Sequence, residues 1–225
     1  KMIKKKISII FFHGLAGNKF HFDKKENYLK GYSKISYNLL GFGNNKGKIS
    51  LKKPIINQQF IFLKKKIVKE SSDLVFVFHS LSTVFLPLFL SDTYFKKKIS
   101  KIILIEGDVS KNQLQWSERI SNMTKRDFEN YIHKFKSNHL KVMKMQLVKK
   151  HHNKLKLYSS GFKFFNTSVL RKFSKESVKI IKSNLVLKAI KKTKIKKLLI
   201  ISKLNKALYS KELRKYFNKV CIIKD

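Results

Sequence analysis

Six short apolar runs constrain the fold of this chain more than any other feature. Most are unbroken stretches of Ile, Val, Leu and Phe rather than alternations of apolar and polar residues. Such runs are typical of strands covered on both faces, as in a parallel sheet with crossover helices. The spacing between the first four, roughly 25 to 40 residues, suits βαβ connections. The runs are Ile7–Phe12, Ser33–Leu39, Leu74–Phe78, Ile102–Ile105, Lys197–Ile201 and Lys219–Ile223. We therefore predict an α/β protein with a doubly wound, mostly parallel sheet.

A long interval without a strand pattern separates Ile105 from Lys197. It holds about 90 residues, too many for a simple connection between strands, and its apolar residues recur at helical spacing. The segments Ser117–Phe135 and Ser174–Leu187 are the clearest helices, and Thr124 followed by Asp127 resembles a capping box. We expect a helical cap at 109–195, inserted into an α/β core formed by 1–108 and 196–225.

The composition of the 225 residues fits a folded protein of a reducing compartment. Hydrophobic residues make up 43% of the chain, which excludes a disordered chain. The single cysteine, Cys221, excludes a disulfide framework and any cysteine-rich zinc site. The apolar stretch Leu74–Leu90 is marginal for a membrane span and contains His79 and Pro87, so a buried strand leading into a helix explains it better. Near the start, Ile7–Phe12 is too short for a signal-peptide core. We expect a soluble cytoplasmic protein.

The net charge of +39 suggests anionic partners at first sight, but its composition favours another cause. Of the 52 basic residues only four are arginine, which leaves 48 lysines. Because arginine forks onto phosphate and reads guanine, a dedicated nucleic-acid protein would be expected to use more of it. Residues with AT-rich codons (Lys, Ile, Phe, Asn) are abundant, and Gly, Pro, Ala and Arg are scarce. We interpret the lysine surplus as the result of an AT-rich genome and predict no specific nucleic-acid partner.

Characteristic turns follow the first four strands in a fixed order. They read His13-Gly14-Leu15-Ala16-Gly17, then Asn38-Leu39-Leu40-Gly41-Phe42-Gly43, then Phe78-His79-Ser80-Leu81-Ser82, and finally Ile105-Glu106-Gly107-Asp108-Val109, with Gln115-Trp116-Ser117-Glu118-Arg119-Ile120 soon after. In this order and spacing the chain resembles the α/β-hydrolase superfamily over essentially its whole length. The last two stretches are similar to a bacterial subgroup with an I-E-G-N-L … F-W-S-R-x-I segment at the start of the cap.

The resemblance implies a serine nucleophile, Ser80, on a strained strand-to-helix turn. A serine hydroxyl is a weak nucleophile and needs an adjacent base. The N–H groups of Leu81 and Leu15 would form the oxyanion hole. The orienting acid would be Glu106, with Asp108 as the alternative, since the turn after the fifth strand lacks an aspartate. No metal and no organic cofactor is implied.

This sequence departs from the family pattern at the elbow and in the loop after the second strand. Small residues usually stand two places before and after the serine, where this chain has Phe78 and Ser82. We expect Phe78 to open the turn or to clash. In the second turn Asn38 and Leu40 replace the usual Asp and Pro.

The triad histidine is expected in a loop after the last strand, but the sequence ends at Asp225. We interpret this as a chain truncated before that loop, or as loss of the base. The leading residue Lys1, rather than a methionine, also suggests a fragment.

Other candidate residues have simpler explanations. His13 and His79 occupy positions that hold loops in the resembled family. His151 and His152 have no third ligand nearby, so a solvated cap loop is expected rather than a metal site. The aromatic residues of the predicted cap should pack it or line its pocket; they are Trp116, Phe162, Phe164 and Phe165.

Two functional hypotheses follow. The first is a carboxylesterase-like serine hydrolase that acts on a small ester or related acyl substrate. The second is a catalytically inactive or truncated hydrolase-fold protein whose basic surface binds anionic partners. The oligomeric state stays open.

Overall fold

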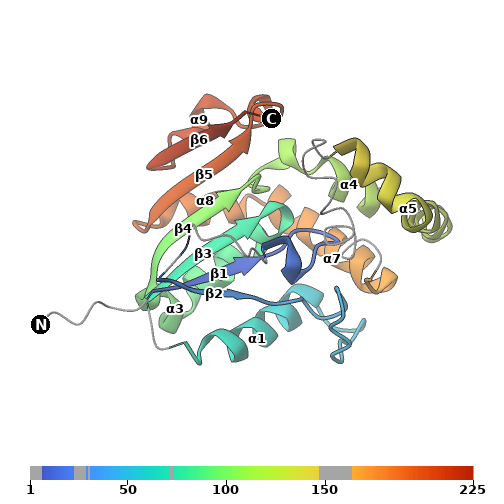
Figure 1. The fold of residues 1–225 in the computed structure, drawn as a ribbon, viewed down its shortest axis with the longest axis horizontal. Helices are drawn as coiled ribbons and strands as arrows, with labels where there is room; N and C mark the ends of the chain where they lie inside the picture. The colour runs from blue at the N-terminus through green and yellow to red at the C-terminus, as the bar shows by residue number, and fades with distance from the viewer. Residues whose placement is uncertain (1–6, 23–28, 30, 71–72, 147–163, 225) are drawn as a thin grey trace, which may run out of the picture.

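The computed structural model describes residues 7–22, 29, 31–70, 73–146 and 164–224 (Figure 1). A six-stranded sheet lies at its centre, with the order β2-β1-β3-β4-β5-β6 and every neighbouring pair parallel. The strands are β1 Ile7–Phe12, β2 Ser33–Ser36, β3 Asp73–His79, β4 Ile99–Ile105, β5 Lys196–Ser202 and β6 Lys219–Ile223. The predicted fold class is confirmed, and each predicted apolar run overlaps one strand, although β3, β4 and β5 extend beyond their runs.

Helices connect the strands and extend past the sheet. The α-helices are α1 Ile55–Ile67, α2 Leu86–Ser91, α3 Thr93–Lys98, α4 Gln115–Asn122, α5 Lys125–Gln146, α7 Thr167–Lys182, α8 Leu185–Lys192 and α9 Lys211–Arg214. Short 3-10 helices are η1 Lys19–Phe22, η3 Ser80–Phe85, η4 Lys111–Gln113 and η6 Lys206–Leu208. Three of the α-helices, α4, α5 and α7, lie beyond the carboxyl ends of the central strands (Figure 1). The division into core and cap stays a prediction.

The second strand is shorter than predicted. It stops at Ser36 because the next backbone groups bind side chains instead of a neighbouring strand. The N–H of Leu39 donates to His13 Nε2 at 3.1 Å, and the N–H of Leu40 donates to Gln59 Oε1 at 2.8 Å. A buried glutamine thus holds the backbone where the family usually has a proline, which has no N–H to donate.

The predicted helix Ser117–Phe135 is two helices. Met123 has an extended backbone with ψ of 143°, and it ends α4. Thr124 then caps α5, because its Oγ accepts a hydrogen bond of 3.1 Å from the Asp127 N–H. Thr124 was predicted correctly as a capping residue, and its Oγ also donates to Asp127 Oδ2 at 2.7 Å; it begins a new helix rather than lying inside one.

The predicted helix Ser174–Leu187 is displaced. Helix α7 begins seven residues earlier, at Thr167, because the Asn166 side chain accepts a hydrogen bond of 3.0 Å from the Val169 N–H. Between α7 and α8 Asn184 adopts a left-handed conformation with φ of 60°, which ends the regular helix before Leu187.

The two faces of the sheet differ in burial. On one face Phe12, Phe76 and Phe78 are fully buried, and the Phe89 ring of α2 packs against all three. On the opposite face Ile103, Leu198 and similar side chains are only half-buried. The unbroken apolar runs predicted strands covered on both faces. On this second face Val77 is buried and Phe22 of η1 stacks on Phe11 with ring centroids 4.9 Å apart, so the described residues cover it in part. The helices α1, α2, α3 and α8 pack together on the first face.

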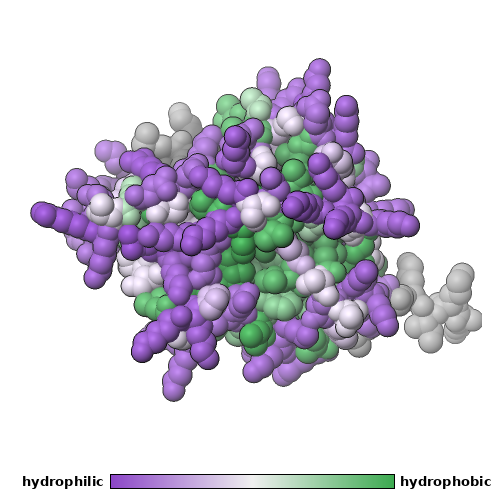
Figure 2. All heavy atoms as spheres, turned by 180° about the vertical axis from the view of Figure 1, so that it is seen from behind, coloured by the Kyte–Doolittle hydropathy of each residue, from purple (hydrophilic) through white to green (hydrophobic). Residues whose placement is uncertain are grey.

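Three runs of consecutive lysines lie at the ends of helices. Residues 64–66, 96–98 and 191–192 form the last turns of α1, α3 and α8, where the helix dipole favours positive charge. Figure 2 shows hydrophilic side chains around the rim of one face of the molecule, with a smaller hydrophobic area between them. Among the helices described here, none is both long and apolar enough to cross a membrane.

Candidate active site

Ser80 lies at the junction of β3 and η3, where the sequence predicts a nucleophile elbow. Its backbone is left-handed, with φ of 51°. This conformation costs a non-glycine residue about 1–2 kcal/mol and is found at functional sites more often than elsewhere. The side chain is half-buried. The strand-to-helix turn therefore holds a serine in a strained conformation at the carboxyl edge of the sheet.

The turn after β1 touches this elbow at Gly14. A Cβ atom on Gly14 would lie 2.9 Å from Ser80 Cβ and 3.1 Å from the His79 carbonyl oxygen. Only glycine permits so close an approach of the two turns. The contact brings Leu15, the residue after Gly14, to the same edge as Leu81, and both side chains are buried. Leu81 is in the first turn of η3, whose N–H groups have no partner within the helix.

Phe78 does not open the elbow, so the expectation of a clash or an opened turn is wrong. Its ring stacks on Phe12 of the neighbouring strand, with centroids 4.6 Å apart and planes 10° apart. Two residues after the nucleophile, Ser82 is fully buried, and its Oγ lies 3.0 Å from the Phe12 carbonyl oxygen and 2.8 Å from that of His79. The bulk of Phe78 is directed into the core, and Ser82 ties the elbow to the end of β1.

Asp108 is a hydrogen-bonding neighbour of the nucleophile. Its N–H donates to the Ser80 carbonyl oxygen at 3.3 Å. Thr83 joins the two turns, because its Oγ donates to the Asp108 carbonyl oxygen at 2.6 Å. Burial and, second, the nearby Glu106 raise the pKa of Asp108 to about 8, against the opposing effect of the Ser80 hydrogen bond. At neutral pH the protonated carboxyl is the main form.

Glu106 lies at the end of β4 but is oriented toward the loop after β5. Its Oε1 accepts a hydrogen bond of 2.5 Å from the Ser202 N–H, and its Oε2 accepts one of 2.8 Å from Asn205 Nδ2. The backbone at Glu106 is left-handed, with φ of 48°. Both candidate acids thus lie at the carboxyl edge, Asp108 beside Ser80 and Glu106 beside the loop in which an aspartate is missing.

Two supporting residues were missed from the sequence. The Tyr209 hydroxyl donates to the Gly107 carbonyl oxygen at 3.2 Å, and burial, Glu106 and Asp108 together raise the pKa of Tyr209. Thr83, described above, is the other. Its spacing of three residues from Ser80 on a helix was a usable signal, whereas nothing local identifies Tyr209.

His13 holds two loops together, as expected. Its Nε2 accepts from the Leu39 N–H, and its Nδ1 lies 2.9 Å from the Gly14 carbonyl oxygen. These contacts assign the proton to Nδ1. In the same loop the Asn38 side chain accepts a hydrogen bond of 2.7 Å from the Lys19 N–H, which attaches the second turn to the first.

Trp116 packs α4 against α5 rather than lining an empty space. Its Nε1 donates to the Tyr131 hydroxyl at 2.8 Å, and its ring lies 5.5 Å from that of Phe135. Phe162, His151 and His152 lie outside the described residues. Within the described ranges no group of three or more His, Cys, Asp or Glu side chains could hold a metal ion.

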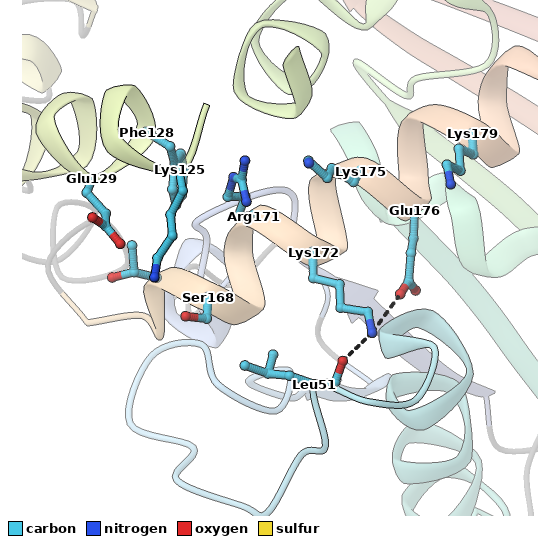
Figure 3. Close-up of a pocket in the computed structure, with 11 residues that line it drawn as sticks. Leu51, Lys125, Phe128, Glu129, Ser168, Arg171, Lys172, Lys175, Glu176 and Lys179 are labelled. Carbon is cyan, nitrogen blue, oxygen red and sulfur yellow. Dashed lines mark hydrogen bonds and ion pairs between the residues drawn. The ribbon is translucent and has the colours of Figure 1, made fainter. Parts of the chain in front are cut away.

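Two hollows of the surface do not include the nucleophile. One of about 740 Å³ is lined by residues after β5 and at the end of β6, among them Lys203 and Tyr209. The other, of about 630 Å³, lies between α5 and α7 (Figure 3). Ser80 lines neither of them.

Comparison with known structures establishes the α/β-hydrolase fold. MenH from S. aureus aligns with a TM-score of 0.70 and 12% identity, over 99% of this chain and 86% of its own. An esterase from Exiguobacterium antarcticum aligns with a TM-score of 0.66 and 12% sequence identity, over 99% of this chain and 84% of the esterase. An α/β-hydrolase from a Medee basin deep-sea metagenome aligns with a TM-score of 0.60 and 16% sequence identity, over 100% of this chain and 82% of that hydrolase. The sequence itself matches no protein-family model and no curated protein.

Proposed function

We propose that this chain is a serine hydrolase that cleaves a small ester or a related acyl substrate. The strained backbone of Ser80 carries the proposal, since a serine is held with φ of 51° at the carboxyl edge of a parallel sheet. A residue whose backbone conformation destabilises the fold is expected where its position is needed for catalysis rather than for stability. The close contact between Gly14 and Ser80 supports it, because it brings the turn that would supply the second oxyanion donor to the nucleophile.

In the proposed reaction Ser80 Oγ attacks the acyl carbonyl carbon, and its proton passes to a base. The N–H groups of Leu15 and Leu81 stabilise the oxyanion of the tetrahedral intermediate. Collapse of the intermediate breaks the bond to the leaving alcohol, which takes the proton. Water then attacks the acyl-enzyme in the same way and releases the acid and Ser80.

None of the residues after β6 in this sequence is a histidine; the resemblance to α/β-hydrolases implies a triad histidine, in the loop that follows the last strand, as the base. Glu106 orients it, and the two hydrogen bonds from Ser202 and Asn205 fix this carboxylate at the carboxyl edge. Asp108 has a different role in the proposal. Because its pKa of about 8 leaves it mainly protonated at pH 7, it positions the Ser80 hydroxyl rather than taking its proton.

The proposal extends to the surroundings of the site. Residues 109–195 would form a cap that selects the acyl group, and α7 supports this by contacting the second turn: the Asn166 N–H donates to the Gly41 carbonyl oxygen at 2.7 Å. The single Cys221 supports a location in the reducing cytoplasm.

Labelling of the native chain with a fluorophosphonate tests the nucleophile. We expect one covalent adduct, on the peptide that contains Ser80, because the reagent traps an activated serine. Ser80→Ala should abolish it. Ser183→Ala is the matched control, since Ser183 is an exposed serine at the end of α7, and it should label like the wild type. A folded native chain that gives no adduct on Ser80 contradicts the proposal.

A further inference from the structure

The groove between α5 and α7 is lined mainly by positive charge (Figure 3). Five basic side chains and two carboxylates line it, and its volume is about 630 Å³. The basic residues are Lys125, Arg171, Lys172, Lys175 and Lys179. Lys125 extends from the start of α5 toward the start of α7, so that the cations come from both walls (Figure 3).

Arg171, Lys175 and Lys179 form a row along α7. They are spaced four residues apart, so they share one face of the helix. Like charges at this spacing destabilise a helix by about 0.2–0.5 kcal/mol a pair. An anion bound along the row would remove this repulsion.

The carboxylates of the groove do not neutralise the row. Glu176 is already engaged, because its two oxygens each accept a hydrogen bond of 3.0 Å from the N–H groups of Ile55 and Ile56 at the start of α1. It also lies 3.9 Å from Lys172 Nζ. Lys175 and Lys179 form no ion pair with any described residue, which leaves Glu129 as the remaining carboxylate in the groove.

Arg171 is held in place at the middle of the groove. Its Nη2 donates to the Met123 carbonyl oxygen at 2.9 Å, and its guanidinium lies 5.9 Å from the centre of the Phe128 ring. Its Nε is buried and has no hydrogen-bond partner among the described residues. The composition of this chain favours lysine at any basic position, because only four of its 52 basic residues are arginine. An arginine at position 171 is therefore unusual for this chain. Its planar fork matches the oxygens of a phosphate group.

We propose that this groove binds a small organic phosphate. Arg171, Lys175 and Lys125 would hold the phosphate, with the Ser168 hydroxyl as a further donor. The apolar part of the ligand would rest on Phe128 and Leu51, which also line the groove. Ser80 is not part of this site, so the proposal goes beyond the hydrolase function and does not depend on it.

Titration calorimetry with phenyl phosphate tests the proposal, and phenol serves as the uncharged probe. We expect one saturable site for phenyl phosphate and no binding of phenol. The double variant Arg171→Gln/Lys175→Gln should weaken binding by about tenfold or more, because it removes charge-assisted hydrogen bonds. Since Arg171 also contacts Met123, Lys175→Gln/Lys179→Gln serves as a second variant that keeps this contact, and it should weaken binding by at least about threefold.

The matched control is Lys96→Gln/Lys97→Gln, two exposed lysines at the end of α3. It removes the same charge from the protein and should change binding by less than about twofold. Ser80→Ala should bind like the wild type, which separates this site from the proposed active site. Equal loss in the groove and control variants, or several weak sites in the wild type, would show general attraction to a protein of charge +39 and overturn the proposal.

Discussion

Replacement of Asp108 by asparagine tests whether the elbow encloses a carboxyl group that is protonated at neutral pH. The Asp108 side chain is buried beside Ser80, and its pKa is raised from 3.8 to about 8, first by burial and then by Glu106. Asparagine has nearly the same shape and remains neutral at every pH. The wild type and Asp108→Asn should therefore respond differently to pH.

The sign follows from the protons bound by each state. Between pH 4 and pH 8 the folded protein keeps a proton on Asp108 that the unfolded chain has released. The free energy of unfolding then falls by about 1.4 kcal/mol for each pH unit in this window. The contribution of the Asp108 proton to the free energy of unfolding is complete below pH 4 and is lost as the pH rises through 8. From pH 5.5 to pH 7.5 the loss amounts to about 3 kcal/mol, and Asp108→Asn should not show it.

Urea denaturation of both proteins at pH 5.5 and pH 7.5 measures this difference. The stability of Asp108→Asn relative to the wild type should rise by about 3 kcal/mol between the two values. Asp127→Asn is the control, because Asp127 is an exposed carboxylate at the start of α5, and its stability should follow the wild type. Parallel pH profiles for the wild type and Asp108→Asn would refute a raised pKa at this position.

Three further substitutions examine the strain, the acid and the link to α1. Ser80→Gly should be about 1 kcal/mol more stable than Ser80→Ala in thermal or urea unfolding, because both lack the hydroxyl but only glycine relieves the left-handed backbone; equal stabilities would mean that the turn is not strained. Glu106→Gln should lower the rate of ester hydrolysis by about a hundredfold or more with a normal circular-dichroism spectrum, whereas unchanged hydrolysis would leave Glu106 a structural residue only. Glu176→Ala should reduce the free energy of unfolding by about 2 kcal/mol, because two N–H groups of α1 lose their acceptor, and Glu129→Ala should change it by less than about 0.5 kcal/mol; similar values for the two variants would contradict this.

The strands were predictable because their signal is local. Each apolar run is continuous in the sequence, and the turns after the first four strands identify the carboxyl edge where Ser80, Glu106 and Asp108 lie. The start of α7 was less visible. The polar residues from Asn166 to Ser168 precede the apolar stripe, and Ser174, which was expected near the start, is buried and donates to the Ser117 carbonyl oxygen.

The remaining features depend on contacts between distant residues. Phe78 fits the elbow because Phe12 offers a stacking partner on another strand, which no local pattern reveals. The hydrogen bond between Ser80 and Asp108 depends on the register of β3 and β4, in which His79 lies beside Ile105. From the sequence alone, the choice between Glu106 and Asp108 could not be made for the same reason.

The pair of hydrogen bonds between the Glu176 carboxylate and the start of α1 also affects the order in which this chain folds. Its two hydrogen bonds join residues 121 and 120 positions apart in the sequence. During synthesis the first turn of α1 therefore lacks these partners until Glu176 has emerged from the ribosome, several seconds later at about 5–20 residues per second. Contacts of such long range slow folding, since the loop must close before they form. The start of α1 consequently reaches its final hydrogen bonding only after a helix encoded much later in the chain has been made.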